Sequence, residues 1–521
     1  MNFLNNITPR EYQTKILETC KIKNCLVVLP TGLGKTLIAL MLAVERQKSF
    51  PGEKVVFLAP TKPLAEQHLN YFKKHLSEMY GDLQLFTGAV NPETRKKIWK
   101  TADIIFSTPQ CVANDLKKEL YDLKGVCLLI EDEAHRCLKN YDYNYIAKNY
   151  IKNSNNPRLL GLTASPGSDP RKIKDICRNL SIEEVELRNR ESNDVKNYLQ
   201  ELEFEKILLD FPPEFEEMRQ VLKKIYDEYI ETLRRLNVLY GMVNKITLIE
   251  LQKKIMGTLA RHPGSNNAGY FVAASVCAQA IKIQHALELL ETQTLETFSI
   301  YLKELVKQSD NKKSRGVVKL VSKPEFNFVF SRALELLAKG VEHPKLIKLE
   351  EIIINEKENN SEFKAIVFTQ FRDTASIISK KLDMIAGIKS KVFVGQAKKK
   401  ETGLSQKEQK KILEDFSENK INVLVATSIA EEGLDIPEVN AVIFYEPIPS
   451  AIRLIQRRGR TARLSKGKLI ILITKNTRDQ AHYYSSRSRE KKMYSEIEKI
   501  KDELKNNNGE LIKDEKQKRL F

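Results

Sequence analysis

The sequence predicts an α/β protein with two doubly wound parallel sheets and an all-helical insertion between them. Short apolar runs alternate with helical patterns over residues 1–205 and again over residues 341–500, which is typical of parallel sheets. Over residues 206–340 the pattern changes, and apolar side chains recur every three or four positions. We therefore expect α/β domains at 1–205 and 341–500, a helical module at 206–340, and a polar, disordered tail at 501–521.

Size, charge and cysteine usage narrow the class of protein. At 521 residues the chain is too long for one hydrophobic core. Its net charge of +18 predicts a polyanionic partner, with general lysine enrichment as the alternative. No apolar run reaches the roughly 18 residues of a membrane span, and the N-terminus lacks signal-peptide features. The seven cysteines are scattered without a C-x-x-C pair, so we expect a cytoplasmic protein without disulfides, a zinc site or a membrane partner.

The segment T-P-R-E-Y-Q at residues 8–13 precedes the first predicted strand. Arg10 and Gln13 lie three residues apart, so both project from one face if this segment is helical. The amide of Gln13 can read an adenine edge through two hydrogen bonds, as glutamine does elsewhere. A solvated helix start is the alternative interpretation.

The first α/β unit contains a predicted phosphate-binding loop, L-P-T-G-L-G-K-T, at residues 29–36. An apolar run precedes the loop and an apolar helical pattern follows it, which is the setting such a loop needs. Its two glycines let backbone N–H groups surround an anion. Lys35 can place its charge on the β- and γ-phosphates, and Thr36 can offer its hydroxyl to Mg²⁺. We predict an ATP site made of Leu29, which stands where the general pattern has glycine, and of Pro30, Thr31, Gly32, Leu33, Gly34, Lys35 and Thr36.

Five further apolar runs, at 54–59, 83–87, 103–107, 126–131 and 158–162, complete the first predicted sheet. Each is followed by a polar cluster at its carboxyl end, where ligands bind in such sheets. After the run at 126–131, Asp132 can hold Mg²⁺ through water, and Glu133 can orient an attacking water. His135 can couple this site to the neighbouring domain by hydrogen bonds. An acidic turn that caps a helix is the alternative.

The order of these blocks resembles that of superfamily 2 helicases: a Q-like segment, P-T-G-L-G-K-T, D-E-A-H at 132–135 and T-A-S at 163–165. The resemblance implies two RecA-like motor domains that use ATP and Mg²⁺. It also implies that the segments after three other predicted strands touch a nucleic-acid backbone, namely Thr61, Lys62, Gly88, Thr108 and Pro109. Such contacts position the nucleic acid and do not read its sequence.

Within the helical insertion, one short basic segment contains Lys312, Lys313 and Arg315. We interpret it as a candidate patch for a DNA duplex or branch point, because lysine and arginine clusters neutralise phosphates. A solvated linker is the alternative interpretation.

The second α/β unit has predicted strands at 365–369, 391–394, 421–426, 441–445 and 469–473 but no phosphate loop, so we expect one ATPase site. In the segment Q-R-R-G-R-T-A-R at 456–463, Arg460 and Arg463 are suited to a γ-phosphate that is losing its bond. Such an arginine finger contributes about 10³–10⁵ in rate, and its place on a second domain makes hydrolysis depend on closure. A basic helix that lies on nucleic acid or in solvent is the alternative. Further predicted site residues here are Gln456 for catalysis, Gly433 and Asp435 for the nucleotide, and Gln370, Arg372, Gly395 and Thr427 for nucleic acid.

Three features together are similar to the archaeal Hef helicases and the Fanconi anaemia M translocase. These are the D-E-A-H block, the helical insertion, and the segments A-T-S-I-A-E-E-G-L-D-I-P at 426–437 and Q-R-R-G-R-T-A-R. The resemblance covers the chain through about residue 495. It implies ATP-driven unwinding or remodelling of forked and branched DNA with 3′-to-5′ movement. Many Hef proteins continue into an XPF-like nuclease, which we do not expect within these residues.

Two other functions stay open. The helicase parts of Dicer and of the RIG-I-like receptors also carry an insertion between motor domains, so a duplex-RNA-dependent ATPase is the second hypothesis. A binding module that uses ATP only as a switch is the third. At the C-terminus, Gln517, Leu520 and Phe521 resemble part of a sliding-clamp-binding peptide, which makes the clamp a candidate partner.

Overall fold

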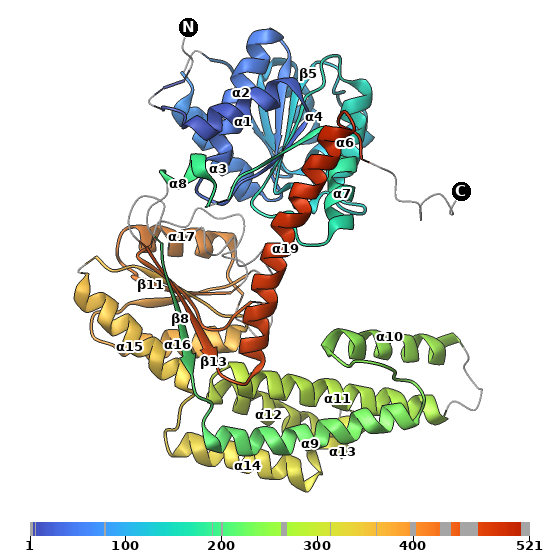
Figure 1. The fold of residues 1–521 in the computed structure, drawn as a ribbon, viewed down its shortest axis with the longest axis vertical. Helices are drawn as coiled ribbons and strands as arrows, with labels where there is room; N and C mark the ends of the chain where they lie inside the picture. The colour runs from blue at the N-terminus through green and yellow to red at the C-terminus, as the bar shows by residue number, and fades with distance from the viewer. Residues whose placement is uncertain are drawn as a thin grey trace.

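The computed structural model describes residues 4–5, 7–77, 80–189, 191–198, 202–261, 268–312, 314–360, 362–395, 403–427, 439–448 and 467–511. Two α/β domains and a helical bundle are joined by a long C-terminal helix, α19 (Arg478–Asn506), which runs from the second α/β domain to the first (Figure 1). All seven cysteines are buried and unpaired. Among the described residues, no helix is both long enough and apolar enough to cross a bilayer.

The first α/β domain contains a seven-stranded, all-parallel sheet of order β3-β4-β2-β5-β6-β1-β7. Every residue of the central strand β5 is buried, as expected for a parallel strand covered on both faces. The doubly wound sheet is confirmed, and β7 is an addition that its short, alternating E-V-E-L pattern did not reveal. The strands are β1 (Cys25–Val28), β2 (Lys54–Leu58), β3 (Leu83–Phe86), β4 (Ile104–Ser107), β5 (Val126–Asp132), β6 (Leu159–Thr163) and β7 (Glu184–Leu187).

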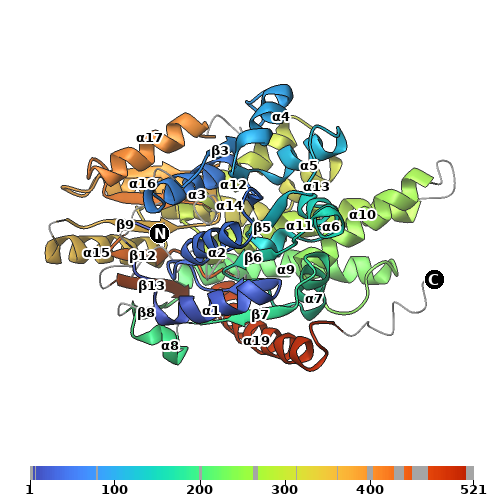
Figure 2. The same cartoon turned by 90° about the horizontal axis from the view of Figure 1, so that it is seen from above.

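Helices cover both faces of this sheet and enclose two hydrophobic cores (Figure 2). One core lies under α1 (Glu11–Ile22), α2 (Lys35–Ser49) and α3 (Lys62–His75). The other lies under α4 (Pro92–Thr101), α5 (Pro109–Lys117), α6 (Asp142–Asn153) and α7 (Pro170–Asn179). Local signals set several helix starts. Asn91, for example, accepts a hydrogen bond from Glu93 N, and Pro92 occupies the first helical position of α4.

The second α/β domain contains a six-stranded parallel sheet of order β10-β11-β9-β12-β13-β8. Its edge strand β8 (Leu202–Leu209) comes from the chain before the helical bundle, and pairs with β13 (Gly467–Thr474) from Leu202 to Leu209. The predicted domain boundary at 205/206 falls inside β8 and is wrong there. Three of the eight residues in the pattern L-E-F-E-K-I-L-L are charged, as suits an edge strand, so it does not form the continuous apolar run that identified the other strands. The remaining strands are β9 (Ala365–Phe368), β10 (Ser390–Phe393), β11 (Val423–Ala426) and β12 (Ala441–Phe444).

The helical bundle is therefore inserted after the first strand of the second α/β domain. Its predicted apolar stripe forms its own core, in which Phe215, Met218, Leu222 and Ile225 are fully buried. The bundle consists of α9 (Pro213–Arg235), α10 (Lys245–Arg261), α11 (Ala268–Thr292), α12 (Leu295–Asp310), α13 (Arg315–Val321) and α14 (Pro324–Ala338). The chain then returns to the second sheet through α15 (Pro344–Asn359), α16 (Arg372–Asp383) and α17 (Gln406–Ser417).

The start of the predicted disordered tail is part of α19. Residues 501–506 continue that helix, and Leu504 is fully buried in a core of the first α/β domain. The prediction is wrong for these residues, because their apolar positions are widely spaced among charged side chains and depend on a distant domain for burial. Residues 512–521 lie outside the described residues.

Candidate nucleotide and nucleic-acid site

The predicted phosphate loop joins β1 to the N-terminus of α2. Gly32 and Gly34 have φ values of 88° and 76°, in the left-handed region that glycine adopts without a steric penalty. The helix begins at Lys35, whose Nζ donates a hydrogen bond to the Leu29 carbonyl over 2.9 Å. The loop thus presents glycine backbone and a helix N-terminus together, which is an arrangement suited to an anion.

Helix α1 supports this loop from one side. Tyr12 Oη donates to the Leu33 carbonyl at 2.8 Å, and Gln13 Nε2 donates to the same oxygen at 3.3 Å. A side chain at Gly34 would collide with Gln13 Nε2, so the position of this amide requires glycine at residue 34. Arg10 N donates to Gln13 Oε1 at 2.8 Å. An amide has two N–H donors and two acceptor lone pairs, so these bonds leave capacity for a base edge.

His68 connects the loop to the acidic end of β5. Its Nε2 lies 2.8 Å from Asp132 Oδ2, and its Nδ1 lies 3.5 Å from Thr36 Oγ1. The side chains of His68 and Asp132 are each only 8% exposed. Sequence reasoning missed His68, although one signal was present. It lies on the face of α3 that also carries the buried Leu64, Leu69 and Phe72, where a polar side chain needs a partner.

Asp132 is held in its ionised form by these neighbours. Burial raises the pKa of a carboxyl group, but the hydrogen bond and charge of His68, together with the charge of Lys35, outweigh burial and lower the pKa of Asp132 below its ordinary value. Tyr143 Oη also donates to the Asp132 carbonyl at 2.7 Å, which supports the end of the strand. The site therefore presents an anionic oxygen beside the phosphate loop at neutral pH.

Glu133 and His135 connect β5 to the end of β6. Glu133 adopts the left-handed conformation, with φ 52° and ψ 46°, where the chain leaves β5. His135 Nδ1 lies 3.3 Å from Glu133 Oε2 and 3.2 Å from Thr163 Oγ1. Thr163 Oγ1 in turn accepts a hydrogen bond from Ser165 N at 3.1 Å. These contacts join the D-E-A-H and T-A-S segments within the first domain, whereas the sequence predicted a role for His135 between domains.

The residues predicted to contact the nucleotide and those predicted to contact nucleic acid lie at different strands of the first sheet. Apart from Arg10 and Gln13, which precede β1, the predicted nucleotide residues of this domain follow β1 and β5, which flank β6. The predicted nucleic-acid residues follow the neighbouring strands β2, β3 and β4. Thr61 directly precedes α3, which begins at Lys62. Thr108 directly precedes α5, which begins at Pro109. Gly88 follows β3 and is exposed. In the second sheet, Gln370, Gly395 and Thr427 follow the neighbouring strands β9, β10 and β11. Arg372 Nη2 donates to the Gly395 carbonyl at 3.0 Å.

Three family models match successive parts of the chain. They are described as "DEAD/DEAH box helicase" over residues 10–173, "Putative ATP-dependent RNA helicase, helical bundle" over 214–361 and "Helicase conserved C-terminal domain" over 344–465. The crystal structure of the Pyrococcus furiosus Hef helicase domain matches with 42% sequence identity and a TM-score of 0.72, over 92% of this chain and 98% of that chain. The chain belongs to the Hef group of superfamily 2 helicases.

The curated relatives are longer than the part of them that matches this Hef-type chain. The "Putative ATP-dependent RNA helicase" of Methanocaldococcus jannaschii is 38% identical over 93% of this chain, which covers 60% of that protein. The "Fanconi anemia group M protein homolog" of Mus musculus is 32% identical over 94% of this chain, which covers 26% of that protein. The chain thus spans a little over half of the first relative and about a quarter of the second.

Several predicted site residues of this Hef-type helicase lie outside the described residues. They are Lys313, Gly433, Asp435, Gln456, Arg460, Arg463 and the segment 517–521. Lys312 and Arg315 are described, and both are exposed between α12 and α13. Arg315 begins α13, so the basic segment is partly helical.

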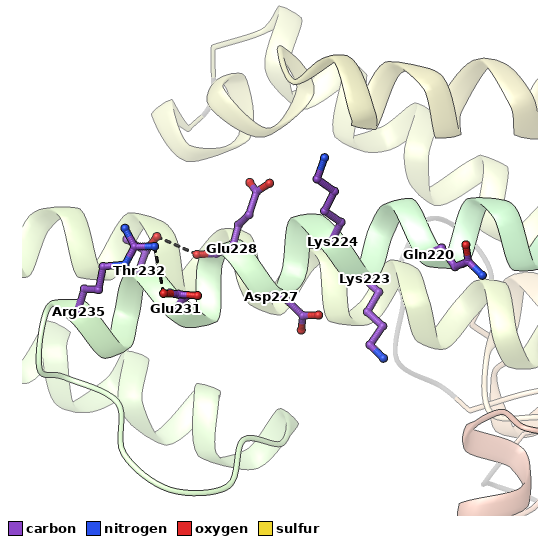
Figure 3. A pocket seen from close by; sticks show the side chains of 8 residues that line it. All are labelled: Gln220, Lys223, Lys224, Asp227, Glu228, Glu231, Thr232 and Arg235. Atoms are coloured by element: carbon purple, nitrogen blue, oxygen red, sulfur yellow. Dashed lines mark hydrogen bonds and ion pairs between the residues drawn. The ribbon is translucent and has the colours of Figure 1, made fainter.

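A concave surface along α9 lies in the bundle and away from the phosphate loop (Figures 1 and 3). It is open to solvent, has a volume of about 670 Å³, and its lining includes three acidic and three basic side chains. Balanced charge does not favour an anionic ligand, so we assign no ligand to this surface.

Glu131, one residue before Asp132, is fully buried on the opposite face of the same strand. Within the described part of the chain, neither of its carboxylate oxygens has a hydrogen-bond partner. Burial raises the pKa of Glu131 well above its ordinary value. The group is therefore a protonated, unpartnered acid in the apolar core.

Replacement of Glu131 by leucine should stabilise the first domain by about 1–3 kcal/mol at neutral pH, because an unsatisfied buried polar group is removed. Between the ordinary pKa of about 4.3 in the unfolded chain and the raised pKa in the folded protein, only the unfolded wild type ionises Glu131, so wild-type stability falls as pH rises through this range. Glu131→Gln removes only this ionisation and should therefore weaken the dependence of the free energy of unfolding on pH. Trp99, the single tryptophan of the chain, lies in this domain, so its fluorescence during urea unfolding from pH 4 to pH 9 measures the effect. If the free energy of unfolding depends on pH in the same way for Glu131→Gln and the wild type, the raised pKa of Glu131 is contradicted.

Proposed function

We propose that this chain is an ATP-dependent DNA helicase or translocase that acts on forked or branched DNA, such as replication forks and Holliday-junction-like structures. The observation that carries the proposal is the contact of Asp132 with His68, beside Thr36 and the phosphate loop. It brings an ionised carboxylate to a glycine loop at a helix N-terminus, which is a site for a nucleotide phosphate.

The residues of the first domain fit ATP with magnesium. The loop at 29–36 would hold the phosphates, Lys35 would neutralise them, and Glu133 would orient the attacking water. Thr36 and Asp132 supply the hydroxyl and carboxylate oxygens that Mg²⁺ prefers, Asp132 through water, and His68 holds these groups near each other. Magnesium, when bound, neutralises charge on the phosphates. Gln13, with Arg10 beside it, would read the adenine edge.

The second domain would complete the site across the interdomain space. Here the proposal rests on sequence, because Gly433, Asp435, Gln456, Arg460 and Arg463 lie outside the described residues. The two arginines would place guanidinium groups on the γ-phosphate, so that hydrolysis requires the domains to close. Repeated closure and release would move the protein along a strand.

The nucleic acid would bind across β2, β3 and β4 of the first sheet and β9, β10 and β11 of the second. Threonine hydroxyls and helix N-termini suit phosphate oxygens, and such contacts would give affinity without sequence readout. The basic segment with Lys312 and Arg315 would add a duplex contact on the bundle. RNA stays a second candidate, because one relative and the bundle family model carry the name of an RNA helicase. A sliding clamp at residues 517–521 remains a sequence prediction.

ATP turnover on a panel of nucleic acids tests the proposal. The panel contains single-stranded, duplex, forked and four-way-junction DNA, with duplex RNA for comparison. We expect forked and four-way DNA to stimulate turnover most and to lose their paired strands in an ATP-dependent manner. Stronger stimulation by duplex RNA would favour the second candidate, and binding without any strand separation would favour a nucleotide switch.

A further inference from the structure

The C-terminal half of α19 is built into the first motor domain. Met493, Ile497, Ile500 and Leu504 are at most 1% exposed, and belong to the hydrophobic core under α7. Lys174 Nζ of α7 also lies 2.8 Å from Glu503 Oε2, and both side chains are mostly buried. Figures 1 and 2 both show this end of the helix beside α7.

The N-terminal end of α19 is fastened to the second motor domain and to the bundle. Asp479 Oδ2 accepts a hydrogen bond from Lys345 Nζ of α15 at 2.8 Å, and both side chains are completely buried. Lys345 Nζ also donates to the Thr292 carbonyl at the end of α11, over 2.6 Å. Arg478 Nη1 donates to the Gln284 carbonyl of α11 at 2.8 Å. The first turn of α19 therefore contacts both the second motor domain and the bundle.

Between these two anchors α19 crosses from one domain to the other as a continuous helix. Residues 487–489, 491 and 492 are exposed, so this span contributes little to either core. At 1.5 Å per residue, Asp479 and Met493 are about 21 Å apart along the axis. An unbroken helix keeps that separation nearly constant, because each of its turns is hydrogen-bonded to the next.

The buried end of α19 contacts the T-A-S segment directly. Ser165 Oγ donates a hydrogen bond to Met493 Sδ over 2.8 Å, and Ser165 is 1% exposed. Ser165 N donates to Thr163 Oγ1, which lies beside His135 of the D-E-A-H segment. A contiguous set of contacts thus leads from the proposed ATP site to Met493, and from there along α19 to the bundle.

We propose that Met493 is a positioning residue, which acts through Ser165 to couple the ATP site to α19, and that α19 transmits this coupling to the second motor domain and the bundle. This inference rests on the proposed function. Packed interfaces of this kind change between discrete arrangements and do not deform continuously, so a shift at the T-A-S segment moves the helix as a unit. Coupling between ATP hydrolysis and strand separation would then depend on α19 as well as on the residues that bind the nucleotide.

The first test compares Met493→Leu with Ile500→Leu. Both variants keep an apolar side chain of similar size in the same core, but only Met493→Leu removes the sulfur that accepts from Ser165. The readout is the amount of forked DNA separated per ATP hydrolysed, together with the melting temperature. We expect this ratio to fall severalfold in Met493→Leu and to stay at the wild-type value in Ile500→Leu. A wild-type ratio in folded Met493→Leu would remove the coupling role and leave the proposed function intact. If DNA does not stimulate ATP hydrolysis by the wild-type protein, both the coupling role and the proposed function are wrong.

The second test changes the helix between its anchors. The double variant Lys491→Gly/Lys492→Gly loosens the exposed span, whereas Lys491→Ala/Lys492→Ala removes the same charges and keeps the helix. Neither pair substitutes one of the anchoring residues of α19 described above, and the single-turnover rate of ATP hydrolysis serves as the internal reference. We expect the glycine pair to lower the ratio of strand separation to hydrolysis, and the alanine pair to preserve it. Equal ratios for the two pairs would overturn the role of α19 as a rigid connection.

Discussion

Lys35→Ala will reduce ATP hydrolysis by about 10²-fold or more, while most of the DNA affinity remains. Lys35 begins α2 at the phosphate loop, and its ammonium group is the cation that the loop itself supplies. Its charge also helps to keep Asp132 ionised. The predicted nucleic-acid residues follow other strands of the sheet, so their phosphate contacts do not require Lys35. Steady-state ATP turnover and DNA affinity, measured on one preparation, check both parts.

Lys48→Ala is the matched control for this variant. Lys48 lies on the same helix, its side chain is 46% exposed, and it pairs with Glu45 at 3.1 Å. Exposed pairs of this kind contribute about 0–1 kcal/mol to stability, so hydrolysis and folding should both be unaffected. Normal turnover by Lys35→Ala would refute the assignment of the phosphate loop, and equal loss in both variants would point to a general effect on α2.

Lys345→Met is expected to destabilise the protein by about 3–5 kcal/mol, because it leaves the Asp479 carboxylate buried without its cationic partner. The variant also removes the hydrogen bond from Lys345 Nζ to the Thr292 carbonyl, which joins α15 to the bundle. The loss should therefore appear in the second domain and the bundle before it appears in the first domain. Thermal unfolding followed by circular dichroism reports the helices of the whole protein, whereas Trp99 fluorescence reports the first domain alone, so the circular dichroism transition should begin at a lower temperature than the fluorescence transition.

Lys348→Met provides the comparison on the same helix. Lys348 pairs with Glu351 at 2.9 Å, but their side chains are 36% and 54% exposed. Solvent screens such a pair, so its loss should cost less than about 1 kcal/mol. The double variant Lys345→Met/Asp479→Leu should recover much of the stability, because no buried charge then lacks a partner. Similar destabilisation by Lys345→Met and Lys348→Met would show that burial of the Lys345–Asp479 pair has little energetic consequence.

The phosphate loop, the D-E-A-H and T-A-S segments and the stripe of the bundle core were all predictable from local sequence. Gly32 and Gly34 specify a tight turn by themselves, because their left-handed conformations depend on their own lack of a side chain. An apolar strand followed by a polar cluster also predicts the carboxyl edge of a parallel sheet without any distant contact. The two-sheet architecture follows from repetition of that pattern.

Tertiary structure alone decided the contacts that join these segments. His68 meets Asp132 across 64 residues, and Ser165 meets Met493 across 328 residues. Likewise β8 pairs with β13 only after the whole bundle has intervened. No local period or turn records such partners, because each depends on how separate elements pack together. The sequence by itself therefore determined which chemical groups this helicase carries, and packing between distant elements decided which of those groups touch.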